Sequence, residues 1–92
     1  MIKSWKNSTT RQLAETGKSK FSGLDAGKAQ TRLSALDDAS ALSDFKNISS
    51  VGLHKLTGDR KGQWAIKVNG PWRICFIFKA GDAYDVEITD YH

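Results

Sequence analysis

The period of the hydrophobic pattern changes near residue 50, and this change constrains the fold more than any other feature of the sequence. Before it, apolar residues recur three and four positions apart, which is the spacing of one helix face. After it, apolar and polar residues alternate, as in strands with one buried face. This order predicts an α+β fold, with two or three N-terminal helices packed on one face of a small, mostly antiparallel twisted sheet. The length of 92 residues suits a single domain over residues 1–92.

The N-terminal half is divided by helix start and stop signals. Residues 1–5 alternate loosely and predict a short first strand. Residues 10–16 follow several N-cap residues and predict a short helix that ends at Gly17. Residues 24–36 predict the longest helix, and residues 40–45 predict one further helical turn. The apolar face of the longest helix contains Ala26, Ala29, Leu33 and Leu36.

The C-terminal half predicts a run of strands joined by tight turns. The strand-like segments are residues 53–56, 63–68, 71–79 and 84–89. Asn69-Gly70 is a strong hairpin signal, and residues 57–62 form a turn or a mobile loop. We expect the helices to cover the sheet face that contains Trp64, Ile66, Ile74, Phe76, Val86 and Ile88, with Tyr84 on the same face. The other face is left open, and it carries Lys67 and Arg73.

Positive charge is concentrated in two blocks of the sequence. Residues 1–36 hold seven Lys or Arg against two acids, and residues 49–79 hold six against one. Residues 80–92 hold four acids and no Lys or Arg, and the formal net charge is +4. A basic surface attracts phosphate backbones, so nucleic acid is one interpretation. An ordinary solvated surface of a small protein is the other.

Several classes of protein are disfavoured by the sequence. It has neither a long apolar segment for a membrane nor an export leader, so we expect a cytoplasmic protein without a membrane partner. The single Cys75 excludes an internal disulfide and a cysteine-based zinc site, and its apolar neighbours predict a buried thiol. His54 and His92 are 38 positions apart and lack nearby acids at ligand spacing, so we expect no metal and no other cofactor.

Two histidines, a tyrosine and an arginine on an open face suit RNA cleavage. The ribose 2′-OH already lies next to the phosphorus, so the protein needs only to move two protons and to stabilise the phosphorane. Histidine serves either proton role near neutral pH. The planar guanidinium of Arg73 suits a crowded phosphate, and Tyr91 can stack on a base or orient a proton.

Each of these residues also has a structural interpretation. A lone histidine at a strand edge, such as His54, is more often a structural surface residue than a functional one, and Tyr91 is equally a core residue. Arg73 can pair with Asp85 or Glu87 on a neighbouring strand. These side chains alone therefore do not establish an enzyme.

Residues 53–92 strongly resemble the HigB branch of the RelE toxin superfamily, also called plasmid-maintenance killer proteins. The motifs that carry the resemblance are "GDRKGQW", "VNGPWRICF", "GDAYDVEI" and the terminal "DYH". The opening "MIKSW" and the length also fit, whereas residues 9–50 fit only in their helical character. The resemblance implies a compact RelE-like microbial RNase fold and an mRNA interferase that inhibits translation by cutting mRNA on the ribosome.

The resemblance also implies partners and residue roles. The partners are a HigA-like helix-turn-helix antitoxin, the ribosome with its rRNA and mRNA, and operator DNA through the antitoxin complex. By matching positions, Arg73 is the phosphate-binding arginine, Asp90, Tyr91 and His92 are the terminal active-site group, and His54 is a second histidine. Our hypothesis is that His92 is the general acid and His54 a candidate base, with Asp90 and Tyr91 as orienting groups. The residues expected to hold RNA are Lys55, Arg60, Lys61 and Lys67.

The resemblance fails at one functional position. Related toxins have a lysine between the leucine and the "GDR", where this sequence has Thr57. The hydroxyl of Thr57 cannot do the work of a lysine ammonium, either as a base or as an electrostatic clamp. We therefore expect that Lys55 or Arg60 takes over this role, or that the nuclease activity is modest. The alternative is a noncatalytic basic module that blocks translation or only binds its antitoxin.

Overall fold

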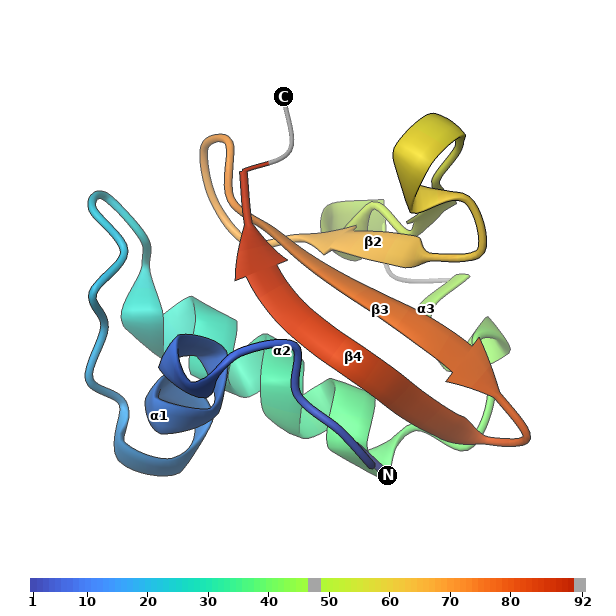
Figure 1. Cartoon of the computed structure of the whole chain (residues 1–92), viewed down its shortest axis with the longest axis horizontal. Helices are drawn as coiled ribbons and strands as arrows, with labels where there is room; N and C mark the ends of the chain where they lie inside the picture. The colour runs from blue at the N-terminus through green and yellow to red at the C-terminus, as the bar shows by residue number, and fades with distance from the viewer. Residues whose placement is uncertain (47–48, 91–92) are drawn as a thin grey trace.

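The computed structural model describes residues 1–46 and 49–90, and it shows three helices beside a four-stranded sheet (Figure 1). The α-helices are α1 (Ser8–Thr16), α2 (Ala26–Asp38) and α3 (Ser43–Lys46), and the short 3-10 helices are η1 (Ser49–Val51) and η2 (Gly58–Arg60). The strands are β1 (His54–Lys55), β2 (Trp64–Lys67), β3 (Arg73–Lys79) and β4 (Asp82–Thr89). The predicted α+β fold class is confirmed.

The ends of α1 and α2 are set by side-chain caps. The Asn7 side chain accepts a hydrogen bond from the Thr10 amide at 2.9 Å, which satisfies a helix N–H that otherwise lacks a partner. α1 ends where Gly17 adopts φ of +76°, a conformation that glycine reaches without steric cost. Asp25 caps α2 in the same way as Asn7 caps α1, so this helix begins two residues later than the apolar spacing predicts.

The four strands form one antiparallel sheet in the order β1-β2-β3-β4. The predicted hairpin at Asn69-Gly70 is confirmed, since the Trp72 amide donates to the Asn69 carbonyl at 2.9 Å and the turn joins β2 to β3. β3 and β4 are joined by Ala80-Gly81 alone, and both residues have positive φ.

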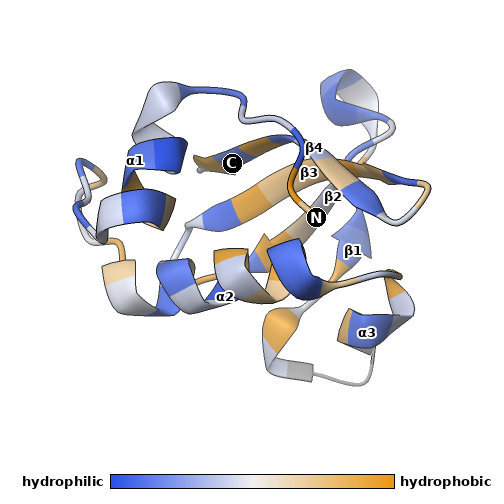
Figure 2. Ribbon diagram, turned by 90° about the horizontal axis from the view of Figure 1, so that it is seen from below, coloured by the Kyte–Doolittle hydropathy of each residue, from blue (hydrophilic) through white to orange (hydrophobic). Residues whose placement is uncertain are grey.

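The core lies between the helices and one face of the sheet, as predicted. Figure 2 shows α1 and α2 on one side of the strands. The helices contribute the buried side chains Leu13, Ala29, Leu33 and Leu36. The sheet contributes Ile66, Ile74, Phe76, Val86 and Ile88, with Trp64 packed at the margin.

Residues 1–5 do not form the predicted strand. They run along the outer edge of β4 as an extended segment with two isolated parallel bridges, Ile2 to Ala83 and Trp5 to Val86. The Ala83 amide donates to the Met1 carbonyl at 2.9 Å and the Val86 amide to the Ser4 carbonyl at 3.1 Å. The buried Thr10 accepts a further bond from the Ile88 amide through its hydroxyl at 3.0 Å. A bulge in β4 interrupts the regular pairing that a strand would need.

The prediction that Tyr84 lies on the core face of the sheet is wrong, because of the same bulge in β4. The register shifts between Cys75 and Ile77 of β3, and Asp85 of β4 has φ of +52°. A bulge adds one residue to one strand, so the alternation of faces changes at that point. Tyr84 therefore lies opposite Ile77 on the far face, and the buried Ala83 takes the place on the core face.

Candidate functional site

A row of polar side chains crosses the sheet face that the helices leave open. Lys67 of β2 lies directly opposite Arg73 of β3, and Arg73 lies directly opposite Thr89 of β4. Residues directly opposite one another point to the same face, and neighbouring strands are about 4.8 Å apart. Two positive charges are therefore held next to each other. Thr89 is a member of this row that the sequence pattern placed on the open face without marking it as functional.

Arg73 is oriented by hydrogen bonds to carbonyls of its own turn. Its Nη1 donates to the carbonyl of Gly70 at 2.8 Å and to that of Trp72 at 2.9 Å. Within residues 1–46 and 49–90 it joins none of the ion pairs, so the alternative pairing with Asp85 or Glu87 is not observed. All its hydrogen bonds to the described residues use Nη1. Nε and Nη2 together form the edge of a guanidinium that binds oxyanions side-on.

The turn before Arg73 is clamped to the loop between α1 and α2. The Asn69 side chain accepts from the Asp25 amide at 2.8 Å and donates to the Gly23 carbonyl at 2.9 Å. The indole N–H of Trp72 donates to the Ser22 carbonyl at 3.0 Å. These bonds fix the start of β3 relative to the helices, which the sequence pattern does not predict.

His54 shares the open face with Arg73. His54 lies opposite Ala65 of β2. Because β2 separates β1 from β3, His54 and Arg73 are about 10 Å apart in the direction across the strands. Along the strands, His54 lies one cross-strand row away from the row that contains Arg73. The exposed ring contacts the Gly52 carbonyl through Nδ1 at 3.2 Å. Because a carbonyl only accepts, a hydrogen bond here requires the tautomer in which Nδ1 carries a hydrogen.

Arg60 lies over the same face of the sheet, where it forms a salt bridge with Glu87. Its Nη1 lies 3.1 Å from Oε1 of Glu87 on β4 and 3.2 Å from Oε1 of Gln63. The positive charge of Arg60 is therefore compensated within the protein. This contact draws the loop of residues 57–62 across part of the sheet, so the open face is smaller than the sequence predicts.

Cys75 lies in a small second cluster on this face. The cluster consists of the buried residues Leu56, Ala65 and Cys75. Burial raises the pKa of the Cys75 thiol to about 11, with a further rise from Glu87 that is opposed by Arg60 and Arg73. The predicted buried thiol is confirmed, and a thiol of this pKa is a poor nucleophile near neutral pH.

Thr57 stands at the mouth of the same loop. It is exposed, occupies the N-cap position of η2 and makes no side-chain capping bond. A pocket of about 400 Å³ is lined by Leu56, Thr57, Asp59 and Arg60. Lys61 is exposed at the end of η2. None of the described residues that line this pocket carries an ammonium group.

Lys55 is not brought together with Arg73. It lies opposite Trp64, whose ring packs against the helix-side core, and its Nζ is 5.9 Å from the centroid of that ring. Lys55 therefore projects from the edge of the sheet on the helix side. Of the four predicted RNA-binding residues, only Lys67 lies in the row of Arg73.

The end of β4 leads to the same row. Thr89 lies opposite Arg73, and the exposed Asp90 follows it directly. The predicted site residues Tyr91 and His92 lie outside the described residues.

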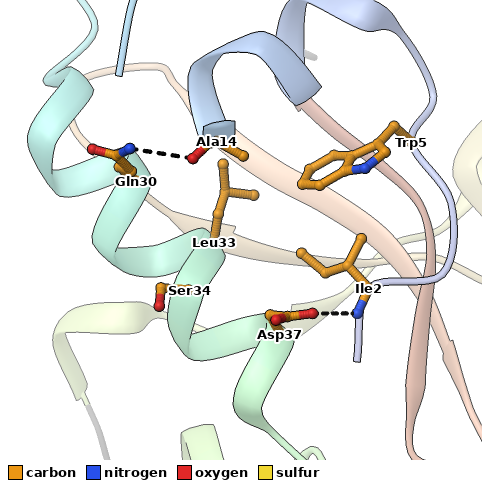
Figure 3. Close-up of a pocket in the computed structure, with 7 residues that line it drawn as sticks. All are labelled: Ile2, Trp5, Ala14, Gln30, Leu33, Ser34 and Asp37. Carbon is orange, nitrogen blue, oxygen red and sulfur yellow. Dashed lines mark hydrogen bonds between the residues drawn. The ribbon is translucent and has the colours of Figure 1, made fainter. Parts of the chain in front are cut away.

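A different pocket, of about 470 Å³, lies on the helix side of the sheet (Figure 3). It is lined by Ile2, Trp5, Ala14, Gln30, Leu33, Ser34 and Asp37. Among the described residues, Asp37 is the one titratable group in this lining, and its carboxylate accepts from the Ile2 amide at 2.8 Å. These lining residues do not include the pair of an acid and a base that hydrolytic chemistry needs.

The part of the chain that the structure describes contains neither a cluster of metal ligands nor a membrane-spanning helix. No three His, Cys, Asp or Glu residues there gather as metal ligands. No helix among these residues has the length and apolar character needed to cross a bilayer.

Two comparisons with known proteins bear on this site. Residues 3–92 match the model of a family described as RelE-like toxins of the type II toxin–antitoxin system HigB. The chain is also 41% identical over 93 residues to a Proteus vulgaris protein named endoribonuclease HigB, and the match covers 100% of both chains. The similarity includes every element that frames the open face.

Proposed function

This chain belongs to the family of RelE-like toxins of the type II toxin–antitoxin system HigB, and on that basis we propose that it is an endoribonuclease that cuts mRNA on the ribosome. The observation that carries the proposal is the row of Lys67 and Arg73 on the open face, where Arg73 is oriented through Nη1. The Nε–Nη2 edge of a guanidinium binds two phosphate oxygens at once. We propose that residues 1–92 act together as one toxin domain in the cytoplasm.

The proposed reaction is attack of the ribose 2′-OH on the adjacent phosphorus. Nε2 of His54 takes the proton from the 2′-OH, and the new P–O bond forms a phosphorane whose charge is stabilised by Arg73. His92 gives a proton to the departing 5′-oxygen as the old P–O bond breaks. The products are a 2′,3′-cyclic phosphate and a free 5′-OH. Asp90 and Tyr91 orient the reacting groups.

The proposed RNA contacts divide between two surfaces. Lys67 and Lys61 bind phosphates on the open face, and Arg60 contributes there while it remains paired to Glu87. Lys55, on the helix side of the sheet edge, contacts rRNA instead. Because none of the described residues that line the loop pocket, Thr57 included, carries an ammonium group, we expect catalysis to depend strongly on Lys67.

The proposed partner is a HigA-like helix-turn-helix antitoxin, and the complex of the two would bind operator DNA. Support comes from the family, which is defined by toxins of two-component toxin–antitoxin systems. The toxin alone has its basic residues available for the ribosome.

Growth inhibition and mRNA cleavage test the proposal. We expect Arg73→Ala and His92→Ala to lower cleavage by at least about 100-fold, because each removes a group that acts in the transition state. Lys79→Ala is the control, since Lys79 lies on the same strand about 20 Å from Arg73 and over the ring of Tyr84. Circular dichroism checks that each variant is folded.

Two outcomes would contradict the proposal. If both variants still stop growth and no mRNA is cut, the protein is a noncatalytic module that blocks translation. If the purified protein cuts naked RNA as fast as ribosome-bound mRNA, ribosome dependence is wrong.

A further inference from the structure

Gly52 lies directly under the side chain of Lys67. A Cβ atom at this glycine would be 2.8 Å from Cδ of Lys67, 2.9 Å from Cε and 3.1 Å from Cγ. Real Cβ atoms essentially never approach carbon atoms to less than 3.0 Å. The lysine stem therefore rests on the Cα of Gly52, in space that any other residue would fill.

The same glycine contacts a second group of the open face. The Gly52 carbonyl is the partner of Nδ1 of His54 at 3.2 Å, and Gly52 has φ of +59°. This conformation aims the carbonyl toward His54 while the Cα faces Lys67. Gly52 thus touches two members of the proposed site although it has no side chain of its own.

Lys67 needs a support of this kind. A lysine side chain has many rotamers, and ordering it when a ligand arrives lowers the affinity. Lys67 also faces Arg73 directly across the strands, so repulsion drives its ammonium away from the guanidinium. Contact with Gly52 restricts the Lys67 side chain to a conformation that keeps its ammonium on the open face beside the Arg73 guanidinium.

We infer that Gly52 is a positioning residue that fixes the Lys67 ammonium for an RNA phosphate next to the one bound by Arg73. The inference rests on the proposed function and deepens it. It assigns a role to a residue between η1 and β1 that carries no chemistry itself.

The test substitutes Gly52 and compares the result with loss of Lys67. Binding is measured on ribosomes programmed with 2′-O-methylated mRNA, which cannot be cut, over a range of salt concentrations. We expect Gly52→Ala to weaken binding about fivefold and to reduce the slope of log affinity against log salt by about 0.7, as loss of one phosphate contact does. Lys67→Ala should give the same changes, and the double variant should be no worse than Lys67→Ala.

Two further variants separate positioning from backbone strain. Gly17→Ala also places a side chain at positive φ, +76°, but its Cβ meets only the end of Gln30 at 3.4 Å and it lies far from the open face. It should lose thermal stability without a change in the salt slope. Gly52→Asn introduces the Cβ while tolerating positive φ, so it should reproduce Gly52→Ala with less loss of stability.

The outcomes distinguish this inference from the proposed function. If Gly52→Ala and Gly52→Asn match Gly17→Ala in affinity and slope while Lys67→Ala is impaired, Gly52 does not position Lys67 and the nuclease proposal stands. If the losses of affinity from Gly52→Ala and Lys67→Ala add up in the double variant, Gly52 does not act through Lys67, and the inference is likewise overturned. Wild-type protein that neither binds nor cuts ribosomal mRNA would overturn both.

Discussion

Lys67 and Arg73 place two positive charges directly opposite each other on neighbouring strands. Neither side chain forms an ion pair within the described residues. Directly opposed like charges destabilise a strand pair by a few tenths to about 1 kcal/mol. Alternation predicted that both side chains share the open face. The pairing register that makes them neighbours depends on the turn between the strands, and alternation alone does not determine it.

The thiol of Cys75 provides a prediction at the scale of one residue. Its pKa is about 11 in the folded protein, against 9.0 for the unfolded value, so between these values the unfolded chain binds fewer protons. The contribution of Cys75 to stability is thus fully present below pH 9 and is lost as the pH rises through 11. The loss reaches about 2 kcal/mol near pH 11.

Urea unfolding from pH 8 to pH 11 measures this loss, with Cys75→Ala as the comparison. The variant should lack this part of the pH dependence, and the difference between the two curves removes the titration of Lys and Tyr. Parallel curves for the two proteins would show that the thiol is not the group responsible.

The elements of the sheet were predicted better than their irregularities. The hairpins and the helix-facing side chains follow from alternation and turn residues. The bulge in β4 was missed because Asp85, which adopts φ of +52°, is not a glycine and leaves no gap in the pattern. The first strand was predicted from Ile2 and Trp5, but the same bulge reduces their pairing to two bridges.

The turn between β3 and β4 offers a prediction at the scale of an element. Ala80 has φ of +51° and precedes Gly81 at +81°, the arrangement in which asparagine is preferred at the first position. We expect Ala80→Asn to stabilise the protein by about 0.5 kcal/mol and to raise Tm by roughly 2–4 °C. Calorimetry measures the change.

Ala35→Asn is the matched control, because Ala35 is exposed on α2 and asparagine is a weaker helix former than alanine. It should lower Tm. A fall in Tm for Ala80→Asn as well would mean that positive φ does not strain this turn.

At the scale of the whole molecule, the layers are joined near the proposed site by contacts that no local pattern predicts. Asn69 was predicted as a turn residue, and its larger role is to bind the loop between α1 and α2, 44 and 46 positions away. Tyr91 and His92 were singled out by their side-chain chemistry and by the family resemblance, and their roles stay predictions. Gly52 was missed because a glycine in a break between elements has no distinctive signal.

Removing the Asn69 side chain tests the connection between the layers. Asn69→Ala should lower the free energy of unfolding by about 1–3 kcal/mol, because the Asp25 amide and the Gly23 carbonyl lose their partner. It should also slow mRNA cleavage, since the turn that orients Arg73 loses its support. Urea unfolding and cleavage at a temperature where the variant is folded measure the two effects.

Asn7→Ala serves as the control for stability, because it removes a helix cap worth about 1 kcal/mol far from β3. It should leave cleavage unchanged. Equal cleavage by the Asn69 and Asn7 variants would show that the clamp serves stability alone.

The extended segment of residues 1–5 has a consequence for the protein in a crowded solution. This segment and Thr10 accept hydrogen bonds from the outward-facing backbone amides of Ala83, Val86 and Ile88. The β4 margin of the sheet therefore has no long row of backbone N–H groups without a hydrogen-bond partner. The opposite margin is β1, which is two residues long and ends in Lys55. Short, charged or covered margins prevent one sheet from adding to another. Edge-to-edge addition, which joins the sheets of separate molecules into aggregates, is therefore disfavoured at both margins.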